Sequence, residues 1–255
     1  MNDLDAREIT ALTGLDTEVF SDIDSTNSEA RRQIEKGLRH DRLIVSDSQS
    51  GGRGRRGRSF HSPSGKGIYM TLVLFPEDLS VSDSLLITSL TAVAVSRALE
   101  KHTEEKTGLK WVNDIYLRGR KIAGILVEAI SDFSGGKVAS LIIGIGANVR
   151  PQVFPGDLPE AGYIDLSHIS RSTVISDIAL EVTDLLNGTD DEKRAAMDEY
   201  RRRSILMGKE ISFEENGVMK YGTVRGITDE GHLLVSLEEK DLELSSGEIS
   251  VRSLF

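Results

Sequence analysis

A cluster of arginine and glycine residues carries the clearest chemistry in the sequence. Residues 52–58 read GRGRRGR, so four arginines and three glycines occur within seven residues. Guanidinium groups bind phosphate and carboxylate oxygens through paired hydrogen bonds, and glycines let the backbone approach a ligand closely. The whole chain has a formal net charge of -10, so this segment opposes the overall charge. The composition predicts a loop that binds a polyanion, although a merely solvated basic loop has the same composition.

Three glycines of this segment also match G-x-G-x-x-G, the spacing found in dinucleotide-binding folds. That fingerprint works only where a strand leads into the N-terminus of a helix, which receives the pyrophosphate. Here the chain runs through residues 62–65 (SPSG) into an apolar segment with the pattern of a strand, so we reject this interpretation. Gly144 and Gly146 lack a third glycine and are interpreted as a place where a ligand lies flat against a strand.

The composition of the 255 residues excludes several classes of protein. Without cysteine there is no disulfide, cysteine nucleophile or thiolate metal site, and the five histidines show no metal-ligand spacing. No run approaches the roughly 18 apolar residues of a membrane span, and the N-terminus is too polar for a signal peptide, so we expect a cytoplasmic protein. The negative charge disfavours a general nucleic-acid binder, which needs a broad basic face. The arginine-rich segment is therefore expected to bind a small anion.

Three apolar runs predict strands that must position this loop. Residues 68–75 are largely apolar on both faces, as in a sheet strand that is covered on both sides. Residues 122–129 and 138–149 predict two further strands, and the turn sequence at 134–136 makes them a hairpin.

Helical spacing accounts for much of the remaining N-terminal part. Apolar residues recur at helical spacing over 84–99 and 174–185, and a charged helix is predicted at 190–203. Thr26 and Glu29 have the spacing of a capping box, so Thr26 is expected to be the N-cap of a short helix.

The pattern changes from about residue 209. Apolar residues alternate with polar ones, Asn216 and Gly217 have the sequence of a tight hairpin turn, and residues 229–231 predict a second turn. Five short strands are expected here, which indicates a small β-barrel. The simplest organisation is an α/β catalytic unit over residues 1–206 and a compact β unit over residues 207–255.

Further segments accompany the arginine-rich loop in a fixed order. They are residues 24–27 (DSTN), Gln49 just before the loop, residues 110–114 (KWVND), residues 121–128 (KIAGILVE) and residues 144–148 (GIGAN). Together they closely resemble the motif set of biotin protein ligases over roughly residues 20–150, with a weaker similarity at residues 247–252. The resemblance implies a mixed, largely antiparallel sheet flanked by helices, like that of class II synthetases, and an SH3-like β-barrel at the C-terminus.

The resemblance implies two reactions in one site. Biotin and ATP give biotinyl-5′-AMP and pyrophosphate, and the biotinyl group then passes to a lysine of a biotin carboxyl carrier domain. Because the first step joins two anions, cations are required. Lys121 is the expected bridge between the biotin carboxylate and the α-phosphate, and Arg53 the expected clamp. Asp114 is expected to receive the acceptor amine, although Asn-Asp alone is more often a turn sequence.

The resemblance also assigns the binding residues. The biotin pocket is expected to include Ser25, Thr26, Asn27, Gln49, Gly52, Arg53, Lys121, Gly124, Gly144 and Gly146. ATP and the adenylate are expected to contact Arg53, Arg55, Arg56, Arg58, Phe60, Lys110, Asn113, Lys121 and Asn148. Mg²⁺ is expected on the triphosphate, with ligands that the sequence does not identify. Helix capping is an alternative role for Thr26, and both roles can coexist at a helix start.

Two residues depart from the family pattern. Val112 stands where proline is usual, and Phe60 stands where tryptophan is common. The smaller ring still offers a stacking face but has no N–H donor, so an altered affinity for the adenylate is expected. Residues before about 20 are too few for a helix-turn-helix, so we expect a ligase without repressor function.

Two other functions stay open at this point. A lipoate or octanoate ligase resembles the same fold and has a catalytic lysine, but the arginine-glycine loop is similar to biotin ligases specifically. A non-catalytic biotin sensor would need the biotin pocket but no groups that bind phosphate. The presence of Lys121, Asp114 and the whole arginine-rich loop argues against such a sensor. The sequence does not identify the acceptor carboxylase. Strand addition at an exposed sheet edge is one way for the acceptor to dock. A homodimer is the favoured assembly.

Overall fold

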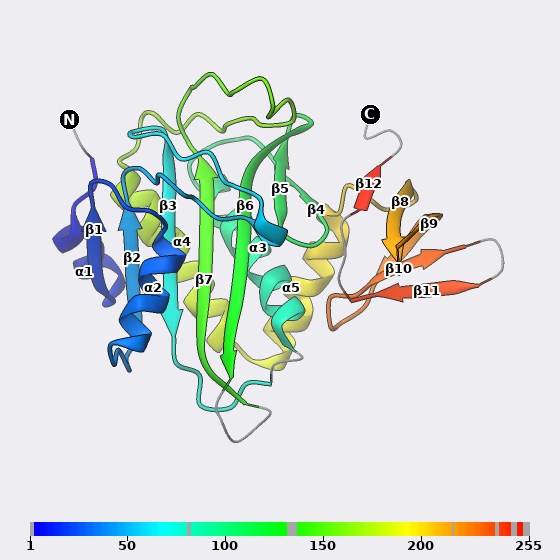
Figure 1. The fold of residues 1–255 in the computed structure, drawn as a ribbon, viewed down its shortest axis with the longest axis horizontal. Coiled ribbons are helices and arrows are strands. Elements are labelled where there is room, and N and C mark those ends of the chain that lie inside the picture. The colour runs from blue at the N-terminus through cyan, green and yellow to red at the C-terminus, as the bar shows by residue number, and fades with distance from the viewer. Residues whose placement is uncertain are drawn as a thin grey trace.

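The structure is a computed structural model that describes residues 3–80, 83–131, 137–215, 217–237, 240–245 and 249–251. A large sheet forms its centre, and a smaller sheet lies beside it (Figure 1). The described strands of the large sheet follow the order β1 (Asp16–Phe20), β2 (Arg42–Ser46), β3 (Gly67–Leu74), β7 (Val138–Asn148), β6 (Arg120–Ser131), β5 (Asp114–Leu117) and β4 (Gly108–Lys110).

The sheet is mixed and largely antiparallel, as predicted. Only β1 and β2 pair in parallel, and each other neighbouring pair of described strands is antiparallel. The three strands predicted from apolar runs are β3, β6 and β7. β6 and β7 pair as expected for a hairpin, whereas the predicted turn at 134–136 lies outside the described residues.

Helices cover both faces of the large sheet. α1 (Ala6–Thr13), α3 (Ser84–Glu100), α4 (Arg171–Asn187) and α5 (Asp190–Arg203) lie on one face, and α2 (Thr26–Glu35) lies on the other (Figure 1). Met70 and Leu72 of β3 belong to the core on the side of α3 and α4, whereas Val73 packs with Ala30 of α2. β3 is therefore covered on both sides, as its sequence predicted.

The start of α2 differs from the prediction. Ser25 is the N-cap, its side chain makes no capping hydrogen bond, and Thr26 is the first helical residue. The Thr26 hydroxyl donates to Oε1 of Gln49 at 3.2 Å, and the Glu29 carboxylate accepts from Arg32 at 2.7 Å. The predicted capping box is therefore wrong, because both of its side chains are engaged with other partners.

The C-terminal part forms the second sheet. Its strands are antiparallel and follow the order β11 (Asp241–Leu244), β10 (Leu233–Ser236), β9 (Val218–Ile227), β8 (Glu210–Glu215) and β12 (Ile249–Val251). This confirms five short strands. Gly217 and Gly231 have φ angles of 78° and 87° at the two predicted turns, which favours glycine there. Asn216 and residues 246–248 and 252–255 lie outside the described residues.

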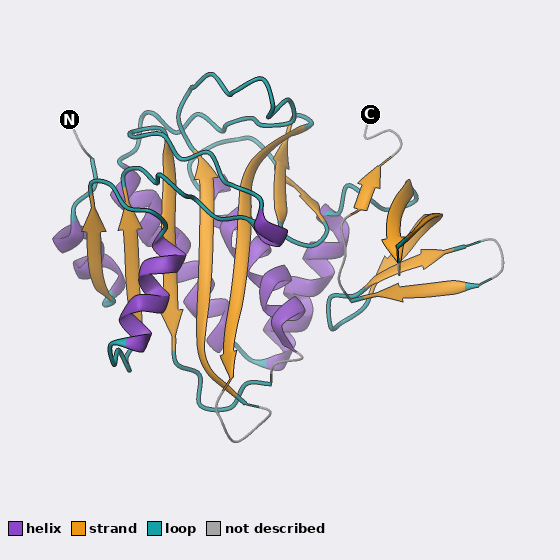
Figure 2. Ribbon diagram, in the orientation of Figure 1, coloured by secondary structure: helices purple, strands orange, loops and turns teal. Residues whose placement is uncertain are grey.

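The loops that matter for the site gather at one end of the large sheet (Figure 2). The arginine-rich segment between β2 and β3 crosses the face that carries α2, and it contains a short 3-10 turn, Arg55–Gly57. None of the helices in the described ranges has the length and apolar character needed to cross a membrane.

Candidate active site

A cavity of about 500 Å³ lies among the start of α2, the arginine-rich loop, the strands β5, β6 and β7, and residues 154–161. Every predicted site residue except Gly52 lines it, namely Ser25, Thr26, Asn27, Gln49, Arg53, Arg55, Arg56, Arg58, Phe60, Lys110, Asn113, Asp114, Lys121, Gly124, Gly144, Gly146 and Asn148. Six lysine and arginine side chains line it together with three carboxylates. The cavity is therefore locally basic within an acidic chain, as a site for anions requires.

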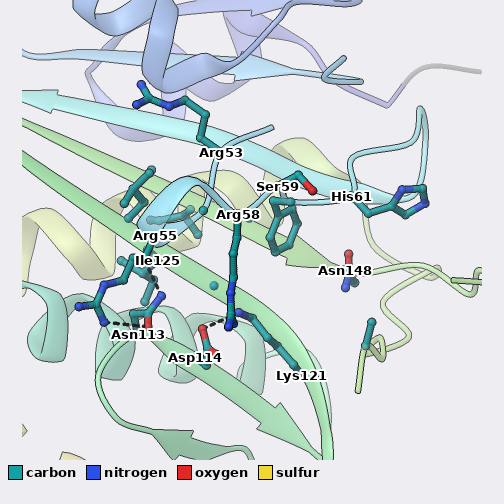
Figure 3. Close-up of a pocket in the computed structure, with 18 of the residues that line it drawn as sticks. Arg53, Arg55, Arg58, Ser59, His61, Asn113, Asp114, Lys121, Ile125 and Asn148 are labelled. Atoms are coloured by element: carbon teal, nitrogen blue, oxygen red, sulfur yellow. Dashed lines mark hydrogen bonds and ion pairs between the residues drawn. The ribbon is translucent and has the colours of Figure 1, made fainter. Parts of the chain in front are cut away.

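Lys121 and Asp114 form an ion pair at the wall of this cavity (Figure 3). Lys121 Nζ lies 2.6 Å from Asp114 Oδ1, and the two residues come from the paired strands β6 and β5. The backbone N–H of Lys121 also donates to the carbonyl of Glu160 at 2.7 Å. The side chains are 33% and 21% exposed, and Oδ1 of Asp114 is itself buried, so Lys121 is the more accessible member of the pair.

The turn between β4 and β5 carries Asn113 and is held from several directions. Nδ2 of Asn113 donates to the carbonyl of Ile125 at 2.9 Å, and the Ile125 N–H donates back to the Asn113 carbonyl at 3.0 Å. Trp111 Nε1 donates to the carbonyl of Gly231 in the second unit at 2.8 Å. Tyr200 of α5 donates to the carbonyl of residue 112 at 3.1 Å. The segment is a turn between strands, and the contacts around it make that turn a rigid support for site residues.

Lys110 and Asn148, both predicted to contact the nucleotide, line the cavity from β4 and β7. Lys110 Nζ lies 5.6 Å from the ring centre of Tyr116. Burial and a hydrogen bond to Glu160 raise the pKa of Tyr116 well above its ordinary value. Asn148 Nδ2 donates to the carbonyl of Gly162 at 2.9 Å, whereas its Oδ1 is buried without a hydrogen-bond partner among the described residues. That oxygen is an acceptor for a donor group of a ligand.

The arginines of the loop point in different directions. Arg55 Nη1 donates to Oδ1 of Asn113 at 3.4 Å. Arg53 extends away from the lysine–aspartate pair (Figure 3), and its Nη2 lies 3.8 Å from Oε1 of Glu128. The loop continues into β3 rather than into a helix, which agrees with our rejection of the dinucleotide fingerprint.

The side chains predicted to bind biotin are joined by hydrogen bonds. Gln49 Oε1 accepts from the Thr26 N–H at 2.9 Å, and Gln49 Nε2 donates to the Ser62 hydroxyl at 2.9 Å. The hydroxyl of Thr71 lies 2.8 Å from the Thr26 hydroxyl and 2.8 Å from Oδ1 of Asn27. Because Thr26 and Asn27 are almost fully buried, these bonds fix how they present their polar groups.

The predicted glycines are each in close contact with side chains or backbone of the protein. A Cβ atom on Gly144 would collide with the amide of Asn27, and one on Gly146 would lie 2.7 Å from the ring of Phe60. Gly52 does not line the cavity, and a Cβ atom there would collide with the carbonyl of Phe60. In the structure it is therefore Asn27 and Phe60, rather than an open ligand surface, that lie against β7 at these glycines.

Thr71 and Glu128 do not line the cavity, but both bind Asn27, which does, and neither was predicted to take part in the site. Glu128 accepts from Nδ2 of Asn27 at 2.9 Å and from Arg31 at 3.1 Å, so it orients the amide of Asn27. Thr71 is a fully buried hydroxyl in an otherwise apolar strand, and Glu128 is a charge near the middle of β6. Both are detectable in principle, because a buried polar group needs a partner. No sequence pattern pointed to residues 154 and 157–161, which line the cavity. Ile249 also lines it, and it lies in the segment 247–252, whose weak family similarity did not predict a place in the site.

Comparison with known proteins gives the same family over both parts of the chain. Residues 19–148 match the profile of the Biotin/lipoate A/B protein ligase family, and residues 206–252 match the Biotin protein ligase C terminal domain. The bifunctional ligase/repressor BirA of Bacillus subtilis is 32% identical over 256 residues, which cover 93% of this chain and 77% of the relative. The biotin--[acetyl-CoA-carboxylase] ligase of Mycobacterium tuberculosis is 26% identical over 240 residues, which cover 91% and 87%.

The fold is also similar to solved structures. The biotin protein ligase of Aquifex aeolicus in complex with biotin and ATP superposes with a TM-score of 0.75 and 28% sequence identity, over 92% of this chain and 98% of that one. The site motifs, both profile matches and the identity to BirA lead to one conclusion. The chain belongs to the biotin/lipoate A/B protein ligase family and is a biotin protein ligase.

Proposed function

We propose that this ligase activates biotin with ATP as biotinyl-5′-AMP and transfers the biotinyl group to a lysine of a biotin carboxyl carrier domain. The observation that carries the proposal is the lysine–aspartate pair, with Nζ and Oδ1 2.6 Å apart, in a basic cavity of about 500 Å³. Small-molecule sites usually measure about 300–1,000 Å³, so the volume suits a small substrate. The Mycobacterium tuberculosis relative is named for an acetyl-CoA carboxylase acceptor, which supports the class of partner.

In the first step a carboxylate oxygen of biotin attacks the α-phosphorus of ATP, and the bond to the pyrophosphate leaving group breaks. Negative charge of both reactants is then crowded together, so cations that are already in place lower the barrier. Lys121 supplies one such cation, and a compact ammonium on a flexible stem can follow the charge from the carboxylate to the phosphate. Arg53, Arg55, Arg56 and Arg58 clamp the carboxylate and phosphates from the loop.

In the second step the neutral amine of the acceptor lysine attacks the carbonyl carbon of biotinyl-AMP, and AMP leaves. A free lysine amine is protonated at neutral pH, so a carboxylate must orient it and accept its proton. Asp114 has this role in our proposal. Its partner in the ion pair is Lys121, so the two half-reactions use neighbouring groups.

The remaining predicted residues bind the two substrates. Ser25, Thr26, Asn27 and Gln49 present polar groups to the ring system of biotin, beside Gly124, Gly144 and Gly146, with Gly52 supporting the loop. Phe60, Lys110, Asn113 and Asn148 hold the nucleotide, and the unpaired Oδ1 of Asn148 accepts a hydrogen bond from it. Mg²⁺ enters on the phosphates of ATP, which are its usual partners.

ATP–pyrophosphate exchange tests this proposal. Biotin should stimulate exchange strongly, whereas lipoate and octanoate should not. The hydroxyl and amide groups of Thr26, Asn27 and Gln49 can hydrogen-bond to the polar ring system of biotin, which the other two acids lack. Exchange with lipoate or octanoate alone would instead make the chain a ligase for those acids. No exchange with any of the three acids would contradict the proposed ligase activity and favour a non-catalytic biotin-binding protein.

A further inference from the structure

A buried cation lies behind the active site. Arg171, the first residue of α4, has a side chain that is only 2% exposed. Its Nε lies 2.6 Å from Oδ1 of Asp3, its Nη2 lies 2.7 Å from Oδ1 of Asp47, and its Nη1 donates to the carbonyl of Gly67 at 3.2 Å. A buried charge is tolerated only when it is paired and hydrogen-bonded, and Asp47 and the Gly67 carbonyl supply both kinds of contact on the side of the loop.

Asp47 connects the two ends of the arginine-rich loop. It follows the last residue of β2, and its side chain accepts hydrogen bonds from the Ser64 hydroxyl and from the Gly65 N–H, the latter at 3.1 Å. Gly65 lies just before β3 and has a φ of 71°. Burial alone would raise the pKa of Asp47, but the hydrogen bonds from Ser64 and Arg171 outweigh it and lower the pKa. The carboxylate is therefore charged at neutral pH and ties the loop shut at its base.

Everything that the proposed chemistry needs from this loop lies between the tied ends. Gln49 and the four arginines follow Asp47 and precede Ser64. Arg171 and Asp47 do not line the cavity, so they act on substrates only through the loop. With its base fixed, the loop has fewer conformations to lose when an anion orders its tip.

We propose that Asp47 and Arg171 are positioning residues that close the base of the arginine-rich loop and so hold it in the conformation that binds biotin and ATP. The inference rests on the proposed function. Releasing the base lowers the fraction of molecules with a competent loop, and apparent affinity falls by that same fraction. At saturating substrates the loop is fully ordered again, so kcat is preserved.

Steady-state adenylation by three variants tests the proposal. Asp47→Asn should raise KM for biotin and for ATP about tenfold, with kcat within about twofold of the wild type. Ser64→Ala, which removes only the hydroxyl at the loop base, should give a smaller change of the same kind. Asp3→Asn is the matched control, because it removes the charge of the other carboxylate while Arg171 keeps its ion pair with Asp47 and its hydrogen bond to Gly67. The loop base then stays intact, so both KM values should stay unchanged.

Two outcomes overturn the inference. An equal rise of KM in Asp3→Asn and Asp47→Asn would show a general structural role. A loss of kcat alone in Asp47→Asn would show fewer folded molecules and no effect on loop population. If Asp47→Asn does not fold, Ser64→Ala carries the test, since its side chain lies at the surface.

Amide exchange of residues 50–63 gives a readout that needs no activity. Exchange should be faster in Asp47→Asn and Ser64→Ala than in the wild type and unchanged in Asp3→Asn. Wild-type exchange rates in all three variants would refute the positioning role. If the wild type forms no biotinyl-AMP, the proposed function fails, and amide exchange still decides whether Asp47 closes the loop.

Discussion

At the scale of single residues, our proposal assigns the two half-reactions to the members of one ion pair, Lys121 and Asp114. Their charged atoms are 2.6 Å apart, so each is the other's partner until a substrate competes. The proposed first step draws Lys121 toward a carboxylate and a phosphate, which frees Asp114 for the acceptor amine.

Lys121→Ala should therefore leave the fold intact and lower formation of biotinyl-AMP about a hundredfold or more, the scale of losing one preorganised transition-state donor. Single-turnover adenylation with labelled ATP measures this. Lys101→Ala is a matched control, because Lys101 is also ion-paired, 2.9 Å from Glu181, but does not line the cavity. It should adenylate biotin like the wild type. Near-normal adenylation by Lys121→Ala would contradict the assignment.

Asp114→Asn keeps the shape of the side chain and removes its charge, so it should impair transfer more than adenylation. Transfer is measured by supplying preformed biotinyl-AMP and acceptor over a range of pH. The variant should recover partly as pH rises, because the acceptor amine, with an ordinary pKa of about 10.4, then becomes neutral without help. Normal transfer with impaired adenylation would place Asp114 with the nucleotide instead.

Residue types and spacing predicted the charged residues of the candidate site. They did not predict Thr71 and Glu128, which hold Asn27 through hydrogen bonds. The arginine-rich segment and the Asn-Asp pair each have an ordinary explanation when taken alone. Lys121, Asp114 and the arginines are recognisable because they occur together, in order, in motifs that resemble those of biotin protein ligases. Thr71 and Glu128 lie in strands, where a single polar residue is read as a solvent-facing position. Only the fold brings Thr71 and Glu128 to Asn27, through contacts 44 and 101 residues apart in sequence.

At the scale of elements, the arginine-rich loop joins a fixed base to a tip that has few apolar contacts. The tip carries Arg55–Gly57, of which no residue is buried. Its like charges repel one another until an anion neutralises them. We therefore expect the tip of the loop to become ordered when substrate binds, whereas the flanking strands β2 and β3 are ordered without it.

We expect the amides of residues 51–65 to exchange rapidly without ligand and slowly with biotinyl-AMP. Hydrogen exchange followed by mass spectrometry measures this directly. β3 (Gly67–Leu74) serves as an internal control, since its residues are mostly buried and paired on both sides, so its protection should not change. Equal exchange of the loop in both states would count against ligand-linked ordering.

Long elements with a regular pattern were predictable, whereas the short strands β4 and β5 of the large sheet were not. The spacing of apolar residues located α3 and α4, and the charged sequence of α5 ends where it was predicted to end. β4 and β5 have only three and four residues, so their pairing is decided by neighbouring strands more than by their own sequence. The start of α2 was misjudged because Thr26 has a tertiary partner that no local rule reveals.

At the scale of the whole molecule, the second sheet packs against the large one and contacts the turn that carries proposed site residues. One apolar core includes Val95 of α3 and Val235 of β10, so the two parts are packed together. Trp111 adds a directed contact, because its indole N–H donates to the buried carbonyl of Gly231. The same segment carries Asn113 and Asp114, so this hydrogen bond joins the second sheet to the turn of the proposed site.

Trp111→Phe keeps an aromatic ring but leaves the carbonyl of Gly231 without its donor, which should reduce the free energy of unfolding by about 1–3 kcal/mol. Tyr200→Phe is the matched control, because it removes a buried hydrogen bond of 3.1 Å to the same turn from α5 and leaves the second sheet untouched. Urea unfolding should show similar losses of stability for both variants. Amide exchange under native conditions should separate them, since the protection of β9 and β10 falls only when the contact between the two sheets is broken. The same loss of protection in Tyr200→Phe, or none in Trp111→Phe, would mean that apolar packing alone couples the second sheet to the turn that carries Asp114.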